Sequence, residues 1–533
     1  MRLLTKNQHA RFHDRASRSA RRTLRHMLYA LAAAAFGAHC EGHRRGSGRA
    51  GSWAGVACLQ VGVLADESRI VGDVSLTKRD TTSEIDISCR PLIPATSFPS
   101  HVAPLPRSSV IAIENAPFDR PRHHRDMIFA LCALGALSLG ALSLAPPPLG
   151  AQLGAQGVLV VRGATVHTAA GAPIANATIV VRDGKIAAVG RDVAIPSGAK
   201  IYDVAGKVII PGLLDEHSHI GGKPSDLNDR PMIIGPQHRF IDALDLDDPS
   251  WKDAVSGGVT TVTTGPGSGE NVSGMAVVIK TFGTDLARRI VLEKGGMKFA
   301  MGAKRNDAYP STTMGVAASL RQYLIKTQEY TAAWKRWDDG DKKGTPPARD
   351  LGYEAMSDVL SKKVRVRAHV HSATDVMTIL RLKDEFGFDL TLHHSTEAYK
   401  VAAEIARRGV SAVVLPLGPR IGIAEDAMSG PAILWKAGVK IAMHTDHPVI
   451  DQKWLRLCAA LAMRYGLPED EALKAITINT AQIARVADRV GSIEVGKDAD
   501  FVVLNGVWYE PGSRVDMVFG DGALIYDRST EGK

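Results

Sequence analysis

Two histidines separated by one residue, His217 and His219, constrain most strongly what this chain can fold into. They follow residues 207–212 (KVIIPG), a short apolar run closed by a Pro-Gly turn signal, which is typical of a buried strand. Alternate residues of a strand point to the same side, so both imidazoles can bind one metal ion from a single strand end. Two near-adjacent histidines alone are more often part of a loop than of a metal site, and later segments decide between these interpretations.

Three further strand patterns end in residues that bind metals. They are residues 364–371 (VRVRAHVH), 388–394 (FDLTLHH) and 439–448 (VKIAMHTDHP). Helical patterns at 375–386 and 398–408 lie between them, and strands that alternate with helices of this length indicate a parallel α/β fold. In a (β/α)8 barrel the strand ends meet on one face, where active sites are built. We therefore expect one site made from these strand ends.

These motifs together resemble the amidohydrolase superfamily, in its imidazolonepropionase-like branch. The first-strand motif is residues 211–219 (PGLLDEHSH), and the closing motifs are 477–481 (TINTA) and 490–500 (VGSIEVGKDAD). The resemblance extends from about residue 157 to 527. It implies a (β/α)8 TIM-type barrel and the metal ligands His217, His219, His369, His394 and Asp446.

The resemblance also implies how the chain is divided. The strand-rich segments on either side of the barrel are expected to pair into a composite β-sandwich domain. An Asp-Gly pair at 521–522 predicts a hairpin in the second of them. We expect a non-native or disordered extension at residues 1–126 and a signal-peptide-like segment at 127–151. The first segment of the β-sandwich is expected at 157–210, the hydrolase barrel at 211–488 and the closing segment of the β-sandwich at 489–528.

The chemistry follows from the ligand types. Imidazoles and a carboxylate suit one divalent ion, with zinc favoured over iron or manganese, and they leave a position for water. Such an ion lowers the pKa of water to roughly 7. Asp446 can accept the proton of the water and pass it to the leaving nitrogen. We therefore predict a hydrolase that cleaves a carbon–nitrogen bond in an amide, cyclic amide or peptide-like small molecule.

Four more histidines lie beside the predicted ligands. We interpret His371 as a catalytic or substrate-contacting group and His447 as a group that orients water or substrate. Turn formation before the following proline explains His447 equally well. His393 fits the end of its strand, and His444 fits a core position.

A cationic group of residues is expected near the pocket. In the family pattern, His238, Arg239 and Arg420 fall in segments close to the site. Two cations there would bind a substrate carboxylate. The alternative is that these are ordinary surface residues.

The number of metal ions stays open in the sequence. Binuclear relatives bridge two ions with a carbamylated lysine or a glutamate, and Lys280, at the end of the apolar run 276–281, is a candidate bridge. Its alternative roles are substrate anchoring or an ion pair. Related sequences have a glutamate after the segment that matches 297–302, where this chain has Ala303. That difference favours one ion.

Two other function classes compete with this prediction. A deaminase of the same superfamily would use similar metal chemistry, but it typically needs a glutamate shortly after the fifth-strand histidine, where this chain has His371, Ser372 and Ala373. A non-catalytic scaffold should have lost metal ligands, and all five are present. Nucleic-acid binding is not predicted, because the basic N-terminal region lacks aromatic interleaving and any recognised motif.

Charge is distributed unevenly along the chain. Residues 1–126 contain 19 Lys and Arg against 11 Asp and Glu, so they account for +8 of the total net charge of +9. The catalytic body is nearly neutral, so the basic character of the whole chain says little about its partners. Four of the five cysteines precede residue 150, so no disulfide framework is expected in the body. We expect a homo-oligomer that acts on a small molecule.

A targeting signal is predicted before the barrel. Residues 122–126 are basic, an apolar run extends through Ala145, and small residues follow to Ala151, which together describe a secretory signal peptide. We therefore expect export to the periplasm, and a cytoplasmic protein if this segment is not used. Arg21 and Arg22 suggest a twin-arginine alternative. The apolar run is shorter than the about 20 residues that span a bilayer, so stable membrane insertion is not expected.

Overall fold

The computed structural model divides the chain into two compact units, residues 1–141 and 142–533, each considered separately. In the first unit, three antiparallel strands form a sheet in the order β1-β2-β3: β1 (Leu59–Asp66), β2 (Arg69–Lys78) and β3 (Ile85–Pro91). The signal-peptide-like segment lies outside the described residues, as does most of the predicted extension. The structure describes residues 59–66, 69–78, 85–91, 157–303, 308–417 and 428–531.

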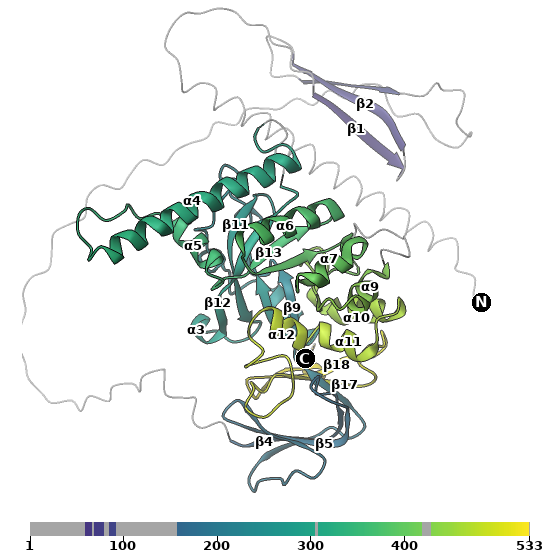
Figure 1. Cartoon of the computed structure of the whole chain (residues 1–533). Helices are drawn as coiled ribbons and strands as arrows, with labels where there is room; N and C mark the ends of the chain where they lie inside the picture. The colour runs from purple at the N-terminus through teal and green to yellow at the C-terminus, as the bar shows by residue number, and fades with distance from the viewer. Residues whose placement is uncertain are drawn as a thin grey trace, which may run out of the picture. The chain divides into compact units, whose positions relative to one another are not determined.

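An eight-stranded sheet curls into a barrel in the second unit (Figure 1). Backbone hydrogen bonds from Asp446 N to His217 O and from His219 N to His447 O, both 3.0 Å, join its two edges. The expected α/β barrel is thus confirmed. Its strands, in spatial and chain order, are β9 (Leu213–Ser218), β10 (Val259–Thr264), β11 (Val272–Lys280), β12 (Ile290–Ala300), β13 (Val366–Val370), β14 (Leu390–His394), β15 (Ser411–Val414) and β16 (Ile441–Met443).

One strand differs from the all-parallel arrangement of a (β/α)8 barrel. β11 pairs antiparallel with both β10 and β12, whereas the other neighbouring pairs within the sheet are parallel. The cause is the connection at residues 265–271, because a parallel pair needs a crossover of a dozen or more residues. Strand β11 therefore runs back towards the end of the barrel where β10 begins.

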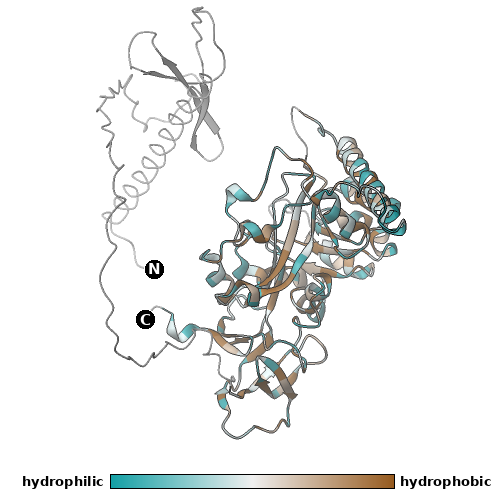
Figure 2. Ribbon diagram, turned by 90° about the vertical axis from the view of Figure 1, so that its left-hand side faces the viewer, coloured by the Kyte–Doolittle hydropathy of each residue, from teal (hydrophilic) through white to brown (hydrophobic). Residues whose placement is uncertain are grey.

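Helices cover the outside of the barrel, and Figure 2 shows brown strands inside against the many teal positions of the outer helices. Helix α6 shows how the sequence sets its bounds, because Ser372 accepts a hydrogen bond from Asp375 N and Gly387 ends the helix at φ 77°. The helices are α2 (Ser250–Ser256), α3 (Leu286–Arg289), α4 (Thr313–Asp339), α5 (Leu351–Leu360), α6 (Ala373–Phe386), α7 (Ala402–Arg407), α9 (Gly430–Lys436), α10 (Leu455–Arg464), α11 (Glu469–Ala475) and α12 (Ile478–Ile483).

A second sheet is built from both flanks of the barrel. β8 pairs antiparallel with β17, so Pro211 faces Phe501 and the segment before the barrel meets the segment after it. Ile209, Phe501 and Phe519 are buried in its own apolar core. The strands are β4 (Leu159–Val166), β5 (Ile174–Arg182), β6 (Lys185–Gly190), β7 (Lys200–Asp203), β8 (Val208–Pro211), β17 (Phe501–Leu504), β18 (Val515–Gly520) and β19 (Ala523–Asp527).

The predicted Asp-Gly hairpin is present between β18 and β19, where Asp521 and Gly522 both have positive φ. The barrel has a separate core that extends from its strands to the surrounding helices. None of the helices in the described ranges combines the length and the apolar character that a membrane span requires.

Candidate metal centre

The strand register brings the predicted ligands to one level of the barrel. His369 on β13 pairs with Ala300 on β12 and with His393 on β14, and His394 pairs with Val370 and with Val414 on β15. These positions lie at or next to the last residues of their strands. The carboxyl ends of β12 to β15 therefore meet at one end of the barrel, as the alternation of strands and helices predicts.

Asp446 lies among three of the histidines. Its Oδ1 is 3.3 Å from Nε2 of His217 and 3.4 Å from Nε2 of His219, and its Oδ2 is 3.8 Å from Nδ1 of His394. Gly265 O lies 2.8 Å from Nδ1 of His219, which orients that ring with Nε2 towards the carboxylate. The ligand atoms of His217, His394 and Asp446 all lie within 4.8 Å of one another.

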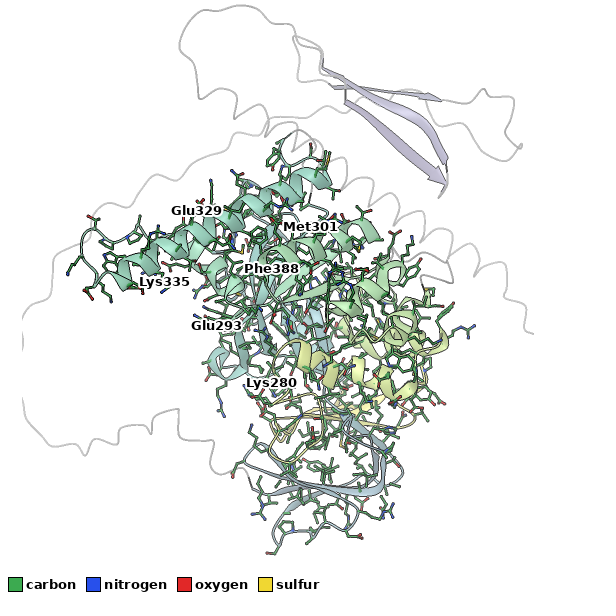
Figure 3. All side chains as sticks on the ribbon, in the orientation of Figure 1. Lys280, Glu293, Met301, Glu329, Lys335 and Phe388 are labelled. Atoms are coloured by element: carbon green, nitrogen blue, oxygen red, sulfur yellow. The ribbon has the colours of Figure 1, made fainter. Side chains whose placement is uncertain are left out.

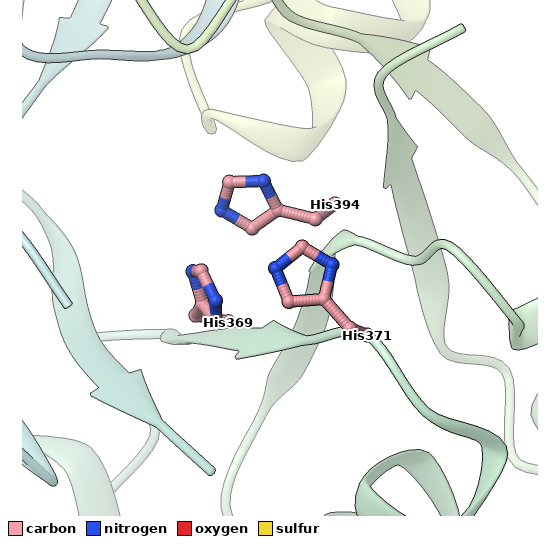
Figure 4. A group of neighbouring side chains, drawn as sticks. All are labelled: His369, His371 and His394. Atoms are coloured by element: carbon pink, nitrogen blue, oxygen red, sulfur yellow. The ribbon is translucent and has the colours of Figure 1, made fainter. Parts of the chain in front are cut away.

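A second group of ligand atoms shares His394. His369, His371 and His394 offer nitrogens within 4.8 Å of one another, and Figure 4 shows the three rings turned towards a common space. The ring centroids of His369 and His394 are 4.1 Å apart. Nδ1 of His371 lies 2.8 Å from Thr396 Oγ1, which fixes its ring. His371, interpreted from the sequence as a catalytic or substrate group, therefore stands where a metal ligand would.

Two further histidines, His393 and His444, lie next to the cluster. The ring of His444 lies 5.2 Å from that of His217 and 4.9 Å from that of His394, and the ring of His393 lies 5.2 Å from His217. Burial lowers the pKa of His444 to about 3 and lowers the pKa of His393 and His217 well below the usual value. These imidazoles are therefore neutral at pH 7, which is the form that binds metals.

Lys298 on β12 is a member of the cluster that the sequence interpretation missed. Its side chain is buried, with Nζ 3.0 Å from Nε2 of His217. Burial lowers the pKa of Lys298 to about 7. The available signal was a lysine inside the otherwise apolar stretch 297–301, where a charged side chain is costly unless it has a role.

Lys280, the candidate bridge from the sequence, belongs elsewhere, and that expectation is corrected. In the antiparallel pairing, Lys280 lies opposite Thr261, which in turn pairs with Leu214 near the start of β9. The end of β10 nearer to the metal-ligand cluster is Thr264, which pairs with Ser218. Figure 3 shows Lys280 at the end of the barrel beside the second sheet and Met301, just past β12, towards the other end. The buried ammonium of Lys280 instead forms ion pairs with carboxylates of the segment after the barrel, those of Asp498, Asp500 and Asp521.

Asp215 connects the two strands that carry the central ligands. Its Oδ1 accepts hydrogen bonds from the backbone N–H of His217 and of Thr445, each 3.2 Å long. Its Oδ2 accepts from Thr445 Oγ1 at 2.5 Å and from Gln452 Nε2 at 3.2 Å. The carboxylate thereby fixes the end of β9 relative to the loop after β16. This network holds His217 and Asp446 in register.

A buried ion pair lies one layer below the cluster. Arg367 on β13 donates to Glu216 Oε1 at 2.6 Å, and Glu216 Oε2 also accepts from Thr263 Oγ1 at 3.1 Å. A second guanidinium nitrogen donates to the carbonyl of Glu216. Burial raises the pKa of Glu216, and the charge of Arg367 with the hydrogen bonds from Arg367 and Thr263 opposes that rise.

Three residues at the site have unusual backbone conformations. His394, Ser395 and Asp446 have φ angles of 63°, 52° and 55°, in the left-handed region that side-chain-bearing residues seldom adopt. Such conformations cost about 1–3 kcal/mol each and persist where the surrounding structure enforces them. Both ligand-bearing residues are thus held by the fold in positions that a free chain would avoid.

The predicted substrate-binding residues do not form a free cationic pair. Arg239 is exposed and donates to Asp242 Oδ1 at 2.7 Å, and His238 Nε2 lies 3.6 Å from Asp229 Oδ2. Arg420 lies outside the described residues. His447 is half-buried at the edge of the cluster, where its carbonyl accepts from His219 N.

Sequence comparison matches residues 208–525 to the model of the amidohydrolase family. This match covers the barrel, every ligand of the cluster and the closing strands. The chain belongs to the amidohydrolase family. It is a metal-dependent hydrolase that acts on carbon–nitrogen bonds.

Individual proteins that are similar to this chain also support its membership of this family. An amidohydrolase from Thermotoga maritima MSB8 of known structure is 36% identical with a TM-score of 0.64, over 69% of this chain and all of that one. An imidazolonepropionase from Thermoplasma volcanium is 24% identical over 68% of this chain and 93% of its own length. The amidohydrolase tasK of Hapsidospora irregularis is 29% identical over 62% of this chain, which spans only 38% of that relative.

Proposed function

We propose that the cluster binds a divalent metal ion and hydrolyses the carbon–nitrogen bond of a small amide, cyclic amide or peptide-like substrate. The observation that carries this proposal is the convergence of His217, His394 and Asp446, whose ligand atoms lie within 4.8 Å of one another. The donor set fits such an ion, because neutral imidazoles and a carboxylate are suitable zinc, iron or manganese ligands. We expect zinc, held by His217, His219, His369, His394 and Asp446.

The bound ion would supply two things, namely a lower pKa for water and polarisation of the substrate carbonyl. The protein supplies the proton transfer. Burial alone would raise the pKa of Asp446, but the hydrogen bond from His219 and the nearby His444 keep it below the usual value. The ionised carboxylate accepts a proton as water adds to the carbonyl carbon. It then donates that proton to the nitrogen as the carbon–nitrogen bond breaks.

A centre with two ions is the second candidate. It is favoured by the two overlapping ligand groups that share His394 and by the position of Lys298 beside His217. Addition of carbon dioxide to the Lys298 amine, with loss of one proton, would give a carbamate with two oxygens. That carbamate would bridge two ions, the role first assigned to Lys280.

Elemental analysis of the full-length protein purified with added zinc tests both forms. About one ion per chain that is lost in His217→Ala supports the mononuclear centre, and about two supports the binuclear centre. His167→Ala is the matched control, because His167 is a half-buried histidine on the segment before the barrel and should leave the metal content unchanged. A folded protein that binds no metal would overturn the proposal.

The substrate is found by a screen of amides, cyclic amides and dipeptides with the metal-loaded protein. Release of an amine or an acid that disappears in Asp446→Asn supports the proposal. Formation of ammonia from amidine-containing rings would favour the deaminase alternative instead. No turnover of any class by a fully metal-loaded protein would revive the scaffold interpretation.

We also propose that the protein is exported through residues 127–151 and acts as a homo-oligomer. Support for export is the basic, apolar and small-residue pattern of that segment. Peptide mass mapping of the native protein tests it, because abundant peptides from residues 1–120 would contradict removal of this region of the chain. Light scattering of the purified protein measures the oligomeric state.

A further inference from the structure

A second cavity lies at the end of the barrel opposite the metal-ligand cluster. Its volume is about 350 Å³, and it is lined by residues where the strands begin, including Gly295 and Gly296 of β12 and Arg365 just before β13. Both strands run from here towards Ala300 and His369 at the cluster. The cavity therefore lies at the other end of these strands, and Arg367, which lines it, also forms the buried ion pair one layer below the cluster.

The lining of this cavity is strongly basic. A single carboxylate, that of Glu293, is among its lining side chains, and it lies 3.6 Å from Arg239 outside the cavity. Three of the lining cations have an acidic partner at 2.5–2.6 Å: Lys294 pairs with Asp358, Arg367 with Glu216 and Arg485 with Asp389. Lys363 lies 3.7 Å from Asp358. The lining cations are Lys294, Lys363, Arg365, Arg367 and Arg485.

Arg365 is the exception among these cations. Among the residues that the structure describes, the acceptor for its guanidinium is the backbone carbonyl of Ile483, and no carboxylate lies within ion-pair distance. The same guanidinium lines an adjoining cavity of about 290 Å³, together with Lys440. Burial lowers the pKa of Arg365, and the nearby charge of Arg485 lowers it further. The carboxylates of Glu216 and Asp389 raise the pKa of Arg365 in part, but each is ion-paired with another arginine. A half-buried cation that has no carboxylate of its own is stabilised when an anion binds beside it.

We propose that this basic cavity binds a small multivalent oxyanion, either a phosphate or a dicarboxylate, with Arg365 as the anchoring residue. The planar guanidinium presents several N–H groups that match the oxygens of such anions. Arg485 is held beside it by the carbonyls of Lys362 and Lys363, at 3.0 Å and 3.1 Å. None of the predicted metal ligands lines this cavity, so an anion can bind here without contacting them.

Calorimetric titration of the full-length, metal-loaded protein with inorganic phosphate and with succinate tests this proposal. Ionic strength is held constant with sodium chloride, because weak interactions of exposed charges depend on salt. The variants are Arg365→Met, Arg365→Lys and, as a matched control, Arg407→Met. Arg407 is an exposed arginine of α7 that pairs with Glu404 and lines neither cavity.

We expect saturable binding of at least one probe to the wild-type protein. Loss of the charge-assisted hydrogen bonds in Arg365→Met should weaken that binding about tenfold to a hundredfold. Arg365→Lys should fall between the two, because it keeps the charge and loses the planar fork, and Arg407→Met should match the wild type. The two probes distinguish phosphate from dicarboxylate recognition.

Phosphate can also bind a metal ion, so the titrations are repeated in the His217→Ala background. Binding that depends on Arg365 should persist there. Equal affinity in the wild type and Arg365→Met, or binding that disappears with the metal, would overturn the proposal. If Arg365→Met does not fold, the wild type is compared with Arg365→Lys instead. Unchanged affinity of Arg365→Lys for both probes would also overturn the proposal.

Discussion

Nζ of Lys298 lies 3.0 Å from Nε2 of His217, so a buried amine of β12 faces the first histidine of β9 inside the barrel. Neither β10 nor β11, which lie between these strands in the sheet, contributes a ligand to the cluster. The amine therefore lies beside the nitrogen through which His217 is proposed to bind the ion.

Replacement of Lys298 by methionine tests that relationship. We expect Lys298→Met to lower the metal content by about one ion per chain, or to weaken metal affinity at least about tenfold to a hundredfold. Lys294→Met is the control, because Lys294 lies on the same strand but is exposed and pairs with Asp358. Unchanged metal content in Lys298→Met, measured by elemental analysis, would restrict Lys298 to a structural role.

Asp446 is expected to carry the proton transfer. Asp446→Asn should lower kcat about 10²- to 10⁴-fold on any substrate found in the screen, since the amide cannot accept the proton. Asp451→Asn is the control from the same loop, where Asp451 is half exposed and near Lys453. Activity within about threefold of the wild type at equal metal content would assign the proton transfer to another residue.

Thr445 is expected to support the site through Asp215. Thr445→Val removes the 2.5 Å hydrogen bond to a fully buried carboxylate and should lower the free energy of unfolding by about 1–3 kcal/mol. The measurement is urea-induced unfolding followed by circular dichroism. Thr331→Val, at an exposed hydroxyl of α4, should change it by less than about 0.5 kcal/mol. Similar losses in the two variants would contradict the role of the Asp215 network.

Lys280 is expected to matter for stability and not for metal binding. Lys280→Met leaves the buried carboxylates of Asp498 and Asp500 without their central cation and should destabilise the protein by about 3–5 kcal/mol. Lys185→Met removes a half-exposed partner of Asp498 and should cost about 1 kcal/mol or less. Loss of metal from a folded Lys280→Met protein would restore Lys280 as a ligand.

The ion pairs of Asp498 predict that the stability of the protein depends on pH. Burial alone would raise the pKa of Asp498, but Lys280 and the hydrogen bond from Lys185 lower it below its usual value. The ionised carboxylate therefore stabilises the fold above the unfolded pKa of about 3.9, and this contribution is lost as the pH falls through the folded pKa. The difference in melting temperature between wild type and Asp498→Asn should be large at pH 7 and shrink below about pH 4. A difference that stays constant down to pH 3 would contradict this.

The local sequence predicted the elements and the ligand types of this protein. Apolar runs that end in histidine or aspartate identify strand ends, because alternate residues share a face and helices separate parallel strands. The sequence pattern, together with the resemblance to the amidohydrolase superfamily, was enough to expect His217, His369, His394 and Asp446 at one end of a barrel. His371 was recognised as a residue of the site, although its position within a ligand group depends on how its ring packs against those of His369 and His394.

The two lysines show what the sequence could not decide. Lys280 and Lys298 both lie in apolar strands, and nothing in their neighbouring residues indicates which one faces the histidines. Strand direction separates them, because the short connection at residues 265–271 turns β11 antiparallel and carries Lys280 away from the cluster. The sequence by itself determined the ligand-bearing strand ends and the family. Only the tertiary structure decided which buried amine meets them, because contacts across a barrel depend on the order and direction of all eight strands.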